Sequence, residues 1–198
     1  METRSLDRTL SLDKANLYVL AATLPGALLI LLPYAAIYRF SALADGLAWY
    51  YAHGLITLLL LVGGTLIHEG LHGLGWALFG RLPLNQIHFG FQWKTITPYA
   101  HCTRPMPIKP YRLGTLLPGL VLGILPLLAA YLLANGALLW FGFIFTLAAG
   151  GDFLILWLLR ADADPWLVED HPSLAGCTLI APSALSAADD AKPGSSQS

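Results

Sequence analysis

The segment LAWYYAHGLITLLLLVGGTLIHEGLHGLGWALF, residues 47–79, decides the fold class of this 198-residue chain. It is apolar over more than the ~20 residues that cross a bilayer as a helix, so it predicts a membrane span that is tilted, kinked or protruding. The sequence His68-Glu69-Gly70-Leu71-His72 stands inside it. Ionisable side chains are costly at membrane depth, so those found there are candidates for function.

The composition also indicates a membrane protein. Hydrophobic residues make up 56 % of the chain and charged residues only 12 %, whereas a soluble domain carries about 25 % charged residues. The formal net charge of −1 argues against a nucleic-acid partner. The lipid bilayer is therefore the first partner that we expect, and the composition gives no indication of the oligomeric state.

Further apolar runs on either side of this segment predict about four transmembrane helices. They cover residues 15–38, 47–79, 113–134 and 137–159. Asn135-Gly136 is a turn signal, so the last two helices are expected to form an antiparallel pair. Ala42-Leu43-Ala44 resembles a signal-peptide cleavage site, but the apolar run before it is longer than a signal core of about 7–15 residues, which favours an uncleaved first span.

The basic residues predict the orientation of these spans. If the N-terminus is cytoplasmic, ten Lys and Arg residues lie on the cytoplasmic side and Arg39 alone lies on the other, as the positive-inside rule requires. The expected organisation is a cytoplasmic segment at 1–14, a four-span domain at 15–160 with a cytoplasmic loop at 80–112, and a cytoplasmic tail at 161–198. The tail has a disorder-prone composition from about residue 183. Cys102 and Cys177 would then remain reduced thiols.

The central loop predicts a short β-hairpin. Apolar and polar residues alternate with a period of two from Ile87 to Trp93, and aromatic and β-branched residues are frequent there. Two interpretations remain open: a hairpin on the membrane surface with a belt of aromatic residues, or an edge strand near a metal that holds a peptide substrate by strand addition.

The His-Glu motif predicts a zinc site. His68 and His72 lie four residues apart and share one face of a helix, and Glu69 beside them is placed to act as a general base toward water. A catalytic zinc usually has three protein ligands. Asp152 is the best third candidate, because it is the acidic residue of the last two spans and lies at the depth of His72, about 12–14 Å from the cytoplasmic end of its helix.

Glycines near both pieces, such as Gly70, Gly73 and Gly151, would permit the close helix approach that a shared ion needs. The alternative is a glycine-packed helix pair in which the polar side chains bond to one another without a metal. Four other histidines are weaker candidates: His53 favours an interfacial position, His88 and His101 lie in the loop, and His171 in Asp170-His171-Pro172 favours a capped turn.

The chain resembles the zincin peptidases of the membrane type, the DUF3267 family, which are similar to compact relatives of the site-2 intramembrane metalloproteases. The resemblance rests on the His-Glu motif with its flanks (67–73), Tyr99-Ala100-His101-Cys102, the proline-bearing third span, Gly151-Asp152 and the segment 170–177, and it covers most of residues 47–180. It implies zinc held by His68, His72 and Asp152, with Glu69 as the base. Site-2 proteases usually place the third ligand in an Asn-Pro-Asp-Gly or Leu-Asp-Gly context, whereas this chain has Gly-Gly-Asp-Phe.

These observations lead to two hypotheses of function. The first is a zinc-dependent intramembrane endopeptidase that hydrolyses peptide bonds in a membrane protein or peptide substrate near the cytoplasmic face. The second is a non-catalytic membrane protein in which the same residues form a structural or regulatory metal site. A small-ion transporter is disfavoured, because no second buried acid outlines a path across the membrane.

Overall fold

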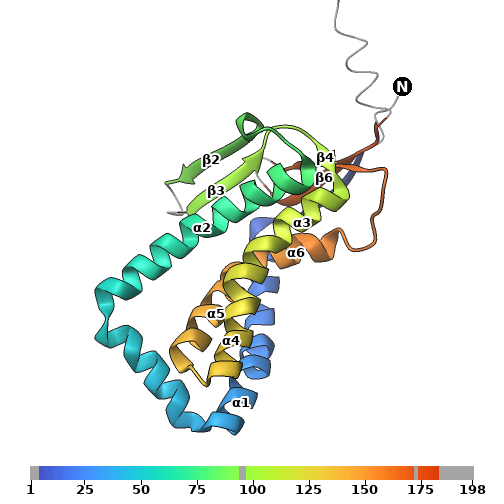
Figure 1. Cartoon of the computed structure of the whole chain (residues 1–198). Coiled ribbons are helices and arrows are strands. Elements are labelled where there is room, and N and C mark those ends of the chain that lie inside the picture. The colour runs from blue at the N-terminus through green and yellow to red at the C-terminus, as the bar shows by residue number, and fades with distance from the viewer. Residues whose placement is uncertain (1–4, 94–96, 172–173, 183–198) are drawn as a thin grey trace, which may run out of the picture.

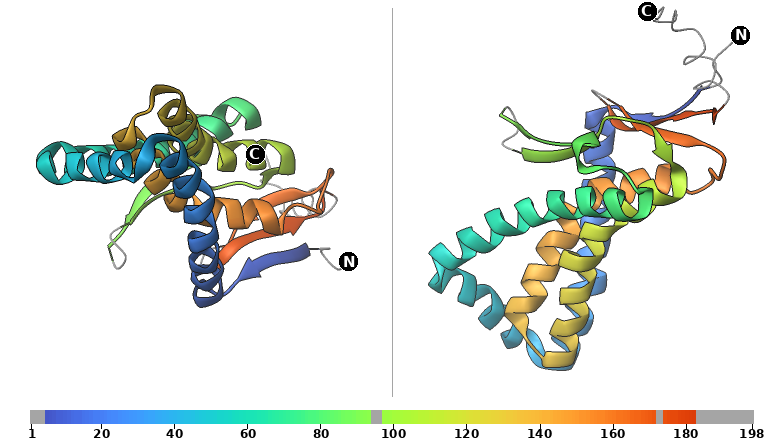
Figure 2. Two further views of the ribbon diagram at one scale, coloured as in Figure 1. Left: turned by 90° about the horizontal axis from the view of Figure 1, so that it is seen from below. Right: turned by 45° about the horizontal axis from the view of Figure 1, so that its top comes forward.

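The computed structural model describes residues 5–93, 97–171 and 174–182 as a helical layer with two small antiparallel sheets at one end (Figures 1 and 2). Three helical runs are long and apolar enough to cross a membrane, and a bent helix pair would make a fourth. The fold class predicted from the sequence is therefore confirmed: the chain is mostly helical, with three or four candidate membrane helices and a small hairpin.

The first two spans differ from the expected boundaries. Helix α1 runs from Leu12 to Ala52 and α2 from Gly54 to Gly80. The break expected between residues 38 and 47 is a kink at Arg39, whose φ of 73° departs from helical geometry. The run expected to be continuous over 47–79 is instead divided at His53, which caps the end of α1 through a bond from its N–H to the Trp49 carbonyl.

The second half of the chain supplies the other helices. Helix α3 (Ile108–Pro118), the π-helical turn Gly119–Ile124 and α4 (Leu125–Leu133) form one helical run. Helices α5 (Gly136–Ala148) and α6 (Gly150–Leu158) follow, bent by 45° at their junction. The turn predicted at Asn135 is present, because the side chain of Asn135 accepts a hydrogen bond from the N–H of Leu138 at the start of α5.

A four-stranded antiparallel sheet joins the two ends of the described chain. Its order is β1-β6-β5-β4, made by Ser5–Leu10, Ala175–Ile180, Leu167–Asp170 and Met106–Pro107. This sheet was not among the elements predicted from the sequence. Gly176 is required here, because its φ is +123° and a Cβ at this position would overlap the Arg8 carbonyl of the neighbouring strand.

The predicted hairpin forms a separate sheet. Strand β2 (Ile87–Gln92) pairs with β3 (Thr97–Cys102) in antiparallel register, with Phe89 opposite Ala100. A short 3₁₀ turn, Leu84–Gln86, precedes it. Buried Ile87 and Cys102 connect the hairpin to an apolar core that also includes Trp76, Tyr111 and Leu179, and this core anchors both sheets to the helices.

Candidate metal centre

Helix α2 presents the two histidines of the His-Glu motif on its buried face. His68 and His72 are each only 6 % exposed. Because the spacing of four residues brings side chains onto one helix face, their rings lie edge to face with centroids 4.9 Å apart. Glu69, the next residue, is half-buried on the side of α2 that faces the hairpin.

Asp152 reaches this pair from the first turn of α6. Its carboxylate faces both rings: Oδ2 lies 3.1 Å from His68 Nε2, and Oδ1 lies 3.3 Å from His72 Nε2. One ligand atom from each of the three residues lies within 4.8 Å of the others, so the group could hold a metal ion. The 45° bend between α5 and α6 and the contact of Gly150 with α1, where a Cβ would stand 2.7 Å from Val19 Cγ1, set the position of this turn.

A hydrogen bond made by His72 indicates which of its two ring nitrogens carries the proton and which has a free lone pair. His72 Nδ1 lies 3.1 Å from the carbonyl oxygen of Gly114, and a carbonyl only accepts, so Nδ1 carries the proton. In a neutral ring, Nε2 is then an acceptor that faces the Asp152 carboxylate, which also only accepts. Two facing acceptors need a cation or a second proton between them, and two imidazoles and a carboxylate are a common ligand set for zinc.

Backbone groups outside the three-residue group form hydrogen bonds with both His72 and Glu69. A carbonyl that orients a ligating histidine is a common feature of metal sites, and Gly114 supplies the carbonyl for His72. This carbonyl comes within reach because α2 and α3 pack closely, as a Cβ on Gly75 would stand 2.6 Å from the Gly114 Cα. The Glu69 Oε2 atom accepts a hydrogen bond of 2.7 Å from the backbone N–H of Ala100 on β3. This bond fixes the Glu69 carboxylate beside the three-residue group.

The remaining histidines lie outside this group. His53 bonds to the Trp49 carbonyl and stacks on the Trp49 ring at the α1–α2 junction. His88 stands opposite His101 in the hairpin register, and His101 pairs with Asp170 on β5. His171 Nδ1 accepts a hydrogen bond from the N–H of Leu174, and the turn predicted at Asp170-His171-Pro172 runs into Pro172, which lies outside the described residues.

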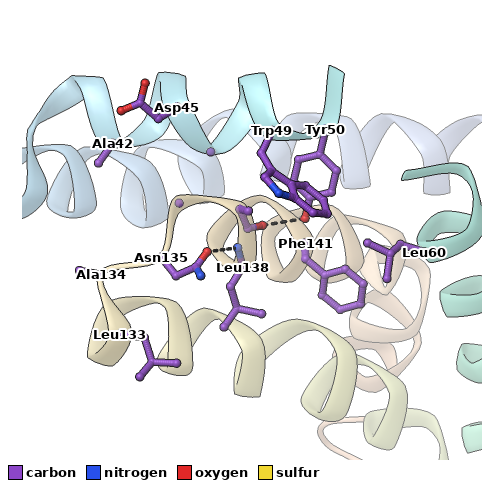
Figure 3. Close-up of a pocket in the computed structure, with 13 residues that line it drawn as sticks. Ala42, Asp45, Trp49, Tyr50, Leu60, Leu133, Ala134, Asn135, Leu138 and Phe141 are labelled. Atoms are coloured by element: carbon purple, nitrogen blue, oxygen red, sulfur yellow. Dashed lines mark hydrogen bonds between the residues drawn. The ribbon is translucent and has the colours of Figure 1, made fainter. Parts of the chain in front are cut away.

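A cavity of about 800 Å³ lies at the α4–α5 turn, away from the His-Glu motif (Figure 3). Trp49 and Tyr50 of α1 face Asn135 and Phe141 across it, and the Tyr50 hydroxyl donates to the Ala137 carbonyl. Its lining includes neither histidine nor cysteine. The chemistry of the chain is therefore concentrated at the α2–α6 contact rather than in this cavity.

Comparison with known families agrees with this placement. The model of the family DUF3267, described as "Putative zincin peptidase", matches residues 60–164. The chain belongs to the DUF3267 family. The matched range contains the motif on α2, the hairpin, and Asp152 on α6, whereas Asp170 and His171 lie beyond it. No curated protein and no solved structure matches the chain.

Several residues that contact the DUF3267 site were not predicted from the sequence. Trp76 lies one turn after His72 and stacks on its ring, and the repeat of four through 68, 72 and 76 is a signal that could have found it. Ala100 and Gly114 act through backbone atoms, which leave no signal in residue type.

Proposed function

We propose that this chain is a zinc-dependent intramembrane endopeptidase that hydrolyses membrane-associated polypeptides. The observation that carries the proposal is the convergence of His68 Nε2 and His72 Nε2 on the two oxygens of Asp152, beside an independently held Glu69 carboxylate. The family described as a zincin peptidase supports zinc as the ion. The long apolar helices support a bilayer location, and the basic residues support cytoplasmic termini.

The chain's own residues suit peptide hydrolysis. His68, His72 and Asp152 would hold the ion, which when bound supplies a Lewis acid that polarises a carbonyl and makes water more acidic. Glu69 takes a proton from the attacking water and delivers it to the leaving amine as the C–N bond breaks. The N–H of Ala100 holds Oε2 of Glu69, so the other carboxylate oxygen is the one available for proton transfer.

Substrate is expected to approach along the hairpin. Strand β3 carries Ala100, the residue that touches Glu69, so a peptide bond presented beside this strand would lie next to the proposed base. An extended segment is required, because the peptide bonds of an intact helix are shielded by their own hydrogen bonds. This supports the edge-strand interpretation of the hairpin over a purely interfacial role.

Metal analysis tests the ion. We expect about one zinc per purified chain, and we expect His68→Ala and Asp152→Ala to lose it while Glu169→Gln, an exposed acid on β5, keeps it. Absence of zinc from the wild-type protein, with zinc supplied during purification, would contradict the proposal.

Glu69→Gln tests catalysis separately from metal binding. This variant should retain zinc, and membrane fractions from cells that express it should lack the new protein N-termini that the wild-type chain produces, as measured by N-terminal labelling and mass spectrometry. If Glu69→Gln keeps zinc and the N-termini are the same in both cells, the site is a structural or regulatory metal centre. The observation that favours this second function is the Glu69–Ala100 bond, because a bond that links α2 to the hairpin stabilises the fold whether or not Glu69 acts as a base.

A further inference from the structure

The carboxylate of Asp170, at the end of β5, contacts side chains on two elements that lie beside the candidate metal centre, helix α3 and strand β3. Its Oδ1 accepts a hydrogen bond of 2.6 Å from the Tyr111 hydroxyl on α3. Its Oδ2 lies 3.3 Å from His101 Nδ1 on β3. The side chain of Asp170 is 19 % exposed, so these contacts are partly shielded from water.

The contact with Tyr111 connects Asp170, through Trp76, to the proposed metal ligand His72. The Tyr111 ring stacks on Trp76 with an interplanar angle of 14° and a centroid distance of 6.0 Å. Trp76 in turn stacks on His72 at 16° and 5.5 Å. The indole N–H of Trp76 also donates to the Tyr111 carbonyl, at 3.4 Å. Three nearly parallel buried rings thus join Asp170 to His72, and close packing transmits a displacement of one ring to the next.

The contact with His101 connects Asp170, through strand β3, to the proposed base Glu69. His101 follows Ala100, whose N–H holds the Glu69 carboxylate. Burial is incomplete on this side, since the His101 side chain is 38 % exposed. A two-stranded hairpin is marginally stable by itself, so β3 depends on tertiary contacts for its position, and the His101–Asp170 pair ties it to the four-stranded sheet.

We infer that Asp170 is a positioning residue that sets the His72 ring through Tyr111 and Trp76, and the Glu69 carboxylate through His101 and strand β3. The roles of ligand and base rest on the proposed function. The link through Tyr111 and Trp76 is measured by metal binding and so also rests on it, whereas the link through His101 to β3 does not, because amide exchange measures it without metal or substrate.

Variants can separate the two links. Tyr111→Phe removes only the hydroxyl that bonds Asp170, His101→Gln removes only the ion pair, and Asp170→Ala removes both. Glu169→Gln is the matched control, because it neutralises the neighbouring exposed acid on the same strand. All are made in the full chain and studied in lipid nanodiscs.

Three measurements give the expected pattern. Tyr111→Phe should weaken zinc affinity, measured by chelator competition, by about tenfold, the lower end of the range for changes around metal ligands, and should shift the visible absorption bands of the cobalt(II)-loaded protein. His101→Gln should leave both unchanged and should speed hydrogen–deuterium exchange of the β3 amides about tenfold, the loss of one charged hydrogen bond. Asp170→Ala should do both, and Glu169→Gln neither.

The inference is overturned if Tyr111→Phe and His101→Gln behave like Glu169→Gln in all three measurements. Those two variants decide the question even if Asp170→Ala does not fold. If zinc binding is lost in His68→Ala but unchanged in Tyr111→Phe and Asp170→Ala, the link from Asp170 to His72 is refuted and the proposed function stays intact. A wild-type protein without zinc would refute the proposed function, while exchange in His101→Gln would still decide whether Asp170 positions β3.

Discussion

The ring of His72 is held on three sides, and each contact removes a degree of freedom. The Gly114 carbonyl fixes its tautomer, Trp76 stacks on its face, and the His68 ring packs against it at an interplanar angle of 80°. A ligand whose rotamer is fixed before the metal arrives loses less entropy on binding than a free side chain. The affinity of the centre should therefore respond to changes in residues that never touch the ion.

Gly114→Ala tests this expectation. A Cβ on Gly114 would overlap the Trp76 indole at Cδ1, and Trp76 is only 4 % exposed, so the ring must shift and disturb His72. We expect zinc affinity to fall about tenfold, as for other changes around metal ligands, in a chelator-competition titration. Gly70→Ala is the control, since nothing lies within 4 Å of its added Cβ, and equal affinities in the two variants would contradict the argument.

The proposed ligands and base could be predicted from the sequence because their signal is chemical. His68, Glu69 and His72 form a spaced motif, and the agreement in depth between His72 and Asp152 pointed to the α2–α6 contact that the structure contains. The contacts that orient them could not be predicted. Ala100 and Gly114 contribute a backbone N–H and a carbonyl, and only the packing of distant segments brings these atoms to the site.

At the scale of elements, the spacing between α2 and α5 depends on a glycine one turn before His68. Gly64 is buried against Phe145, and a Cβ there would overlap the end of that ring. Phe145 is itself only 2 % exposed and packs against Phe141, so it has little room to move. Because α6 continues from α5, the Gly64–Phe145 contact also sets the distance between His68 and Asp152.

Gly64→Ala should push α2 away from α5. We expect a loss of about 1–3 kcal/mol of stability from overpacking together with weaker zinc binding, measured by thermal denaturation with and without zinc. Gly63→Ala has nothing within 4 Å of its added Cβ, so it should be neutral or slightly stabilising through helix propensity. If both variants bind zinc as the wild-type protein does, the Gly64 contact does not set the site.

The four-stranded sheet was not predicted because its strands are short and far apart in sequence. Ser5–Leu10 pairs with Ala175–Ile180, and neither segment has a long alternating pattern. The apolar helices, in contrast, follow directly from composition. The ends of these helices could not be predicted from composition. The α1–α2 junction at His53, for example, depends on local hydrogen bonds such as that from the Thr57 hydroxyl to the Tyr50 carbonyl.

An ion pair connects β1 of this sheet to the chain just after α6. The Arg8 guanidinium donates two hydrogen bonds, of 2.9 and 2.8 Å, to the Asp162 carboxylate. This contact lowers the pKa of Asp162 below its ordinary value. A carboxyl with a lowered folded-state pKa stabilises the fold above its unfolded pKa of about 3.9, and this contribution is lost as the pH falls through the folded value.

Asp162→Asn should therefore destabilise the protein in a pH-dependent way. At pH 7 we expect a loss of about 1 kcal/mol, the upper range for a pair with one partly exposed member, visible as a lower thermal midpoint. The difference from the wild-type midpoint should shrink as the pH falls below about 4. A difference that stays constant from pH 7 to pH 3 would show that the charge of Asp162 does not stabilise the fold.

At the scale of the whole molecule, the pairing of β1 with β6 requires both ends of the described chain to lie at the same end of the helical layer (Figure 2). An even number of membrane crossings would satisfy this requirement, and the bent pair α5–α6 would make the fourth if it forms one span. The candidate metal centre then lies on the side of the sheets. The Asn135 turn and the kink at Arg39 belong to the opposite end.

Reporter fusions can test this arrangement. Green fluorescent protein, which matures in the cytoplasm, should fluoresce when it is fused after residue 182, and alkaline phosphatase should be active when it is inserted at the Asn135–Gly136 turn. The reason is that described basic residues such as Arg81, Arg112 and Arg160 lie at or near the helix ends on the side of the sheets. Arg81→Glu with Arg160→Glu reduces this bias and should lower the ratio of the two signals, whereas Arg39→Gln should preserve it. Fluorescence from both positions in the wild-type chain would contradict a four-span arrangement and would place Asp152 outside the membrane helix on which the shared site depends.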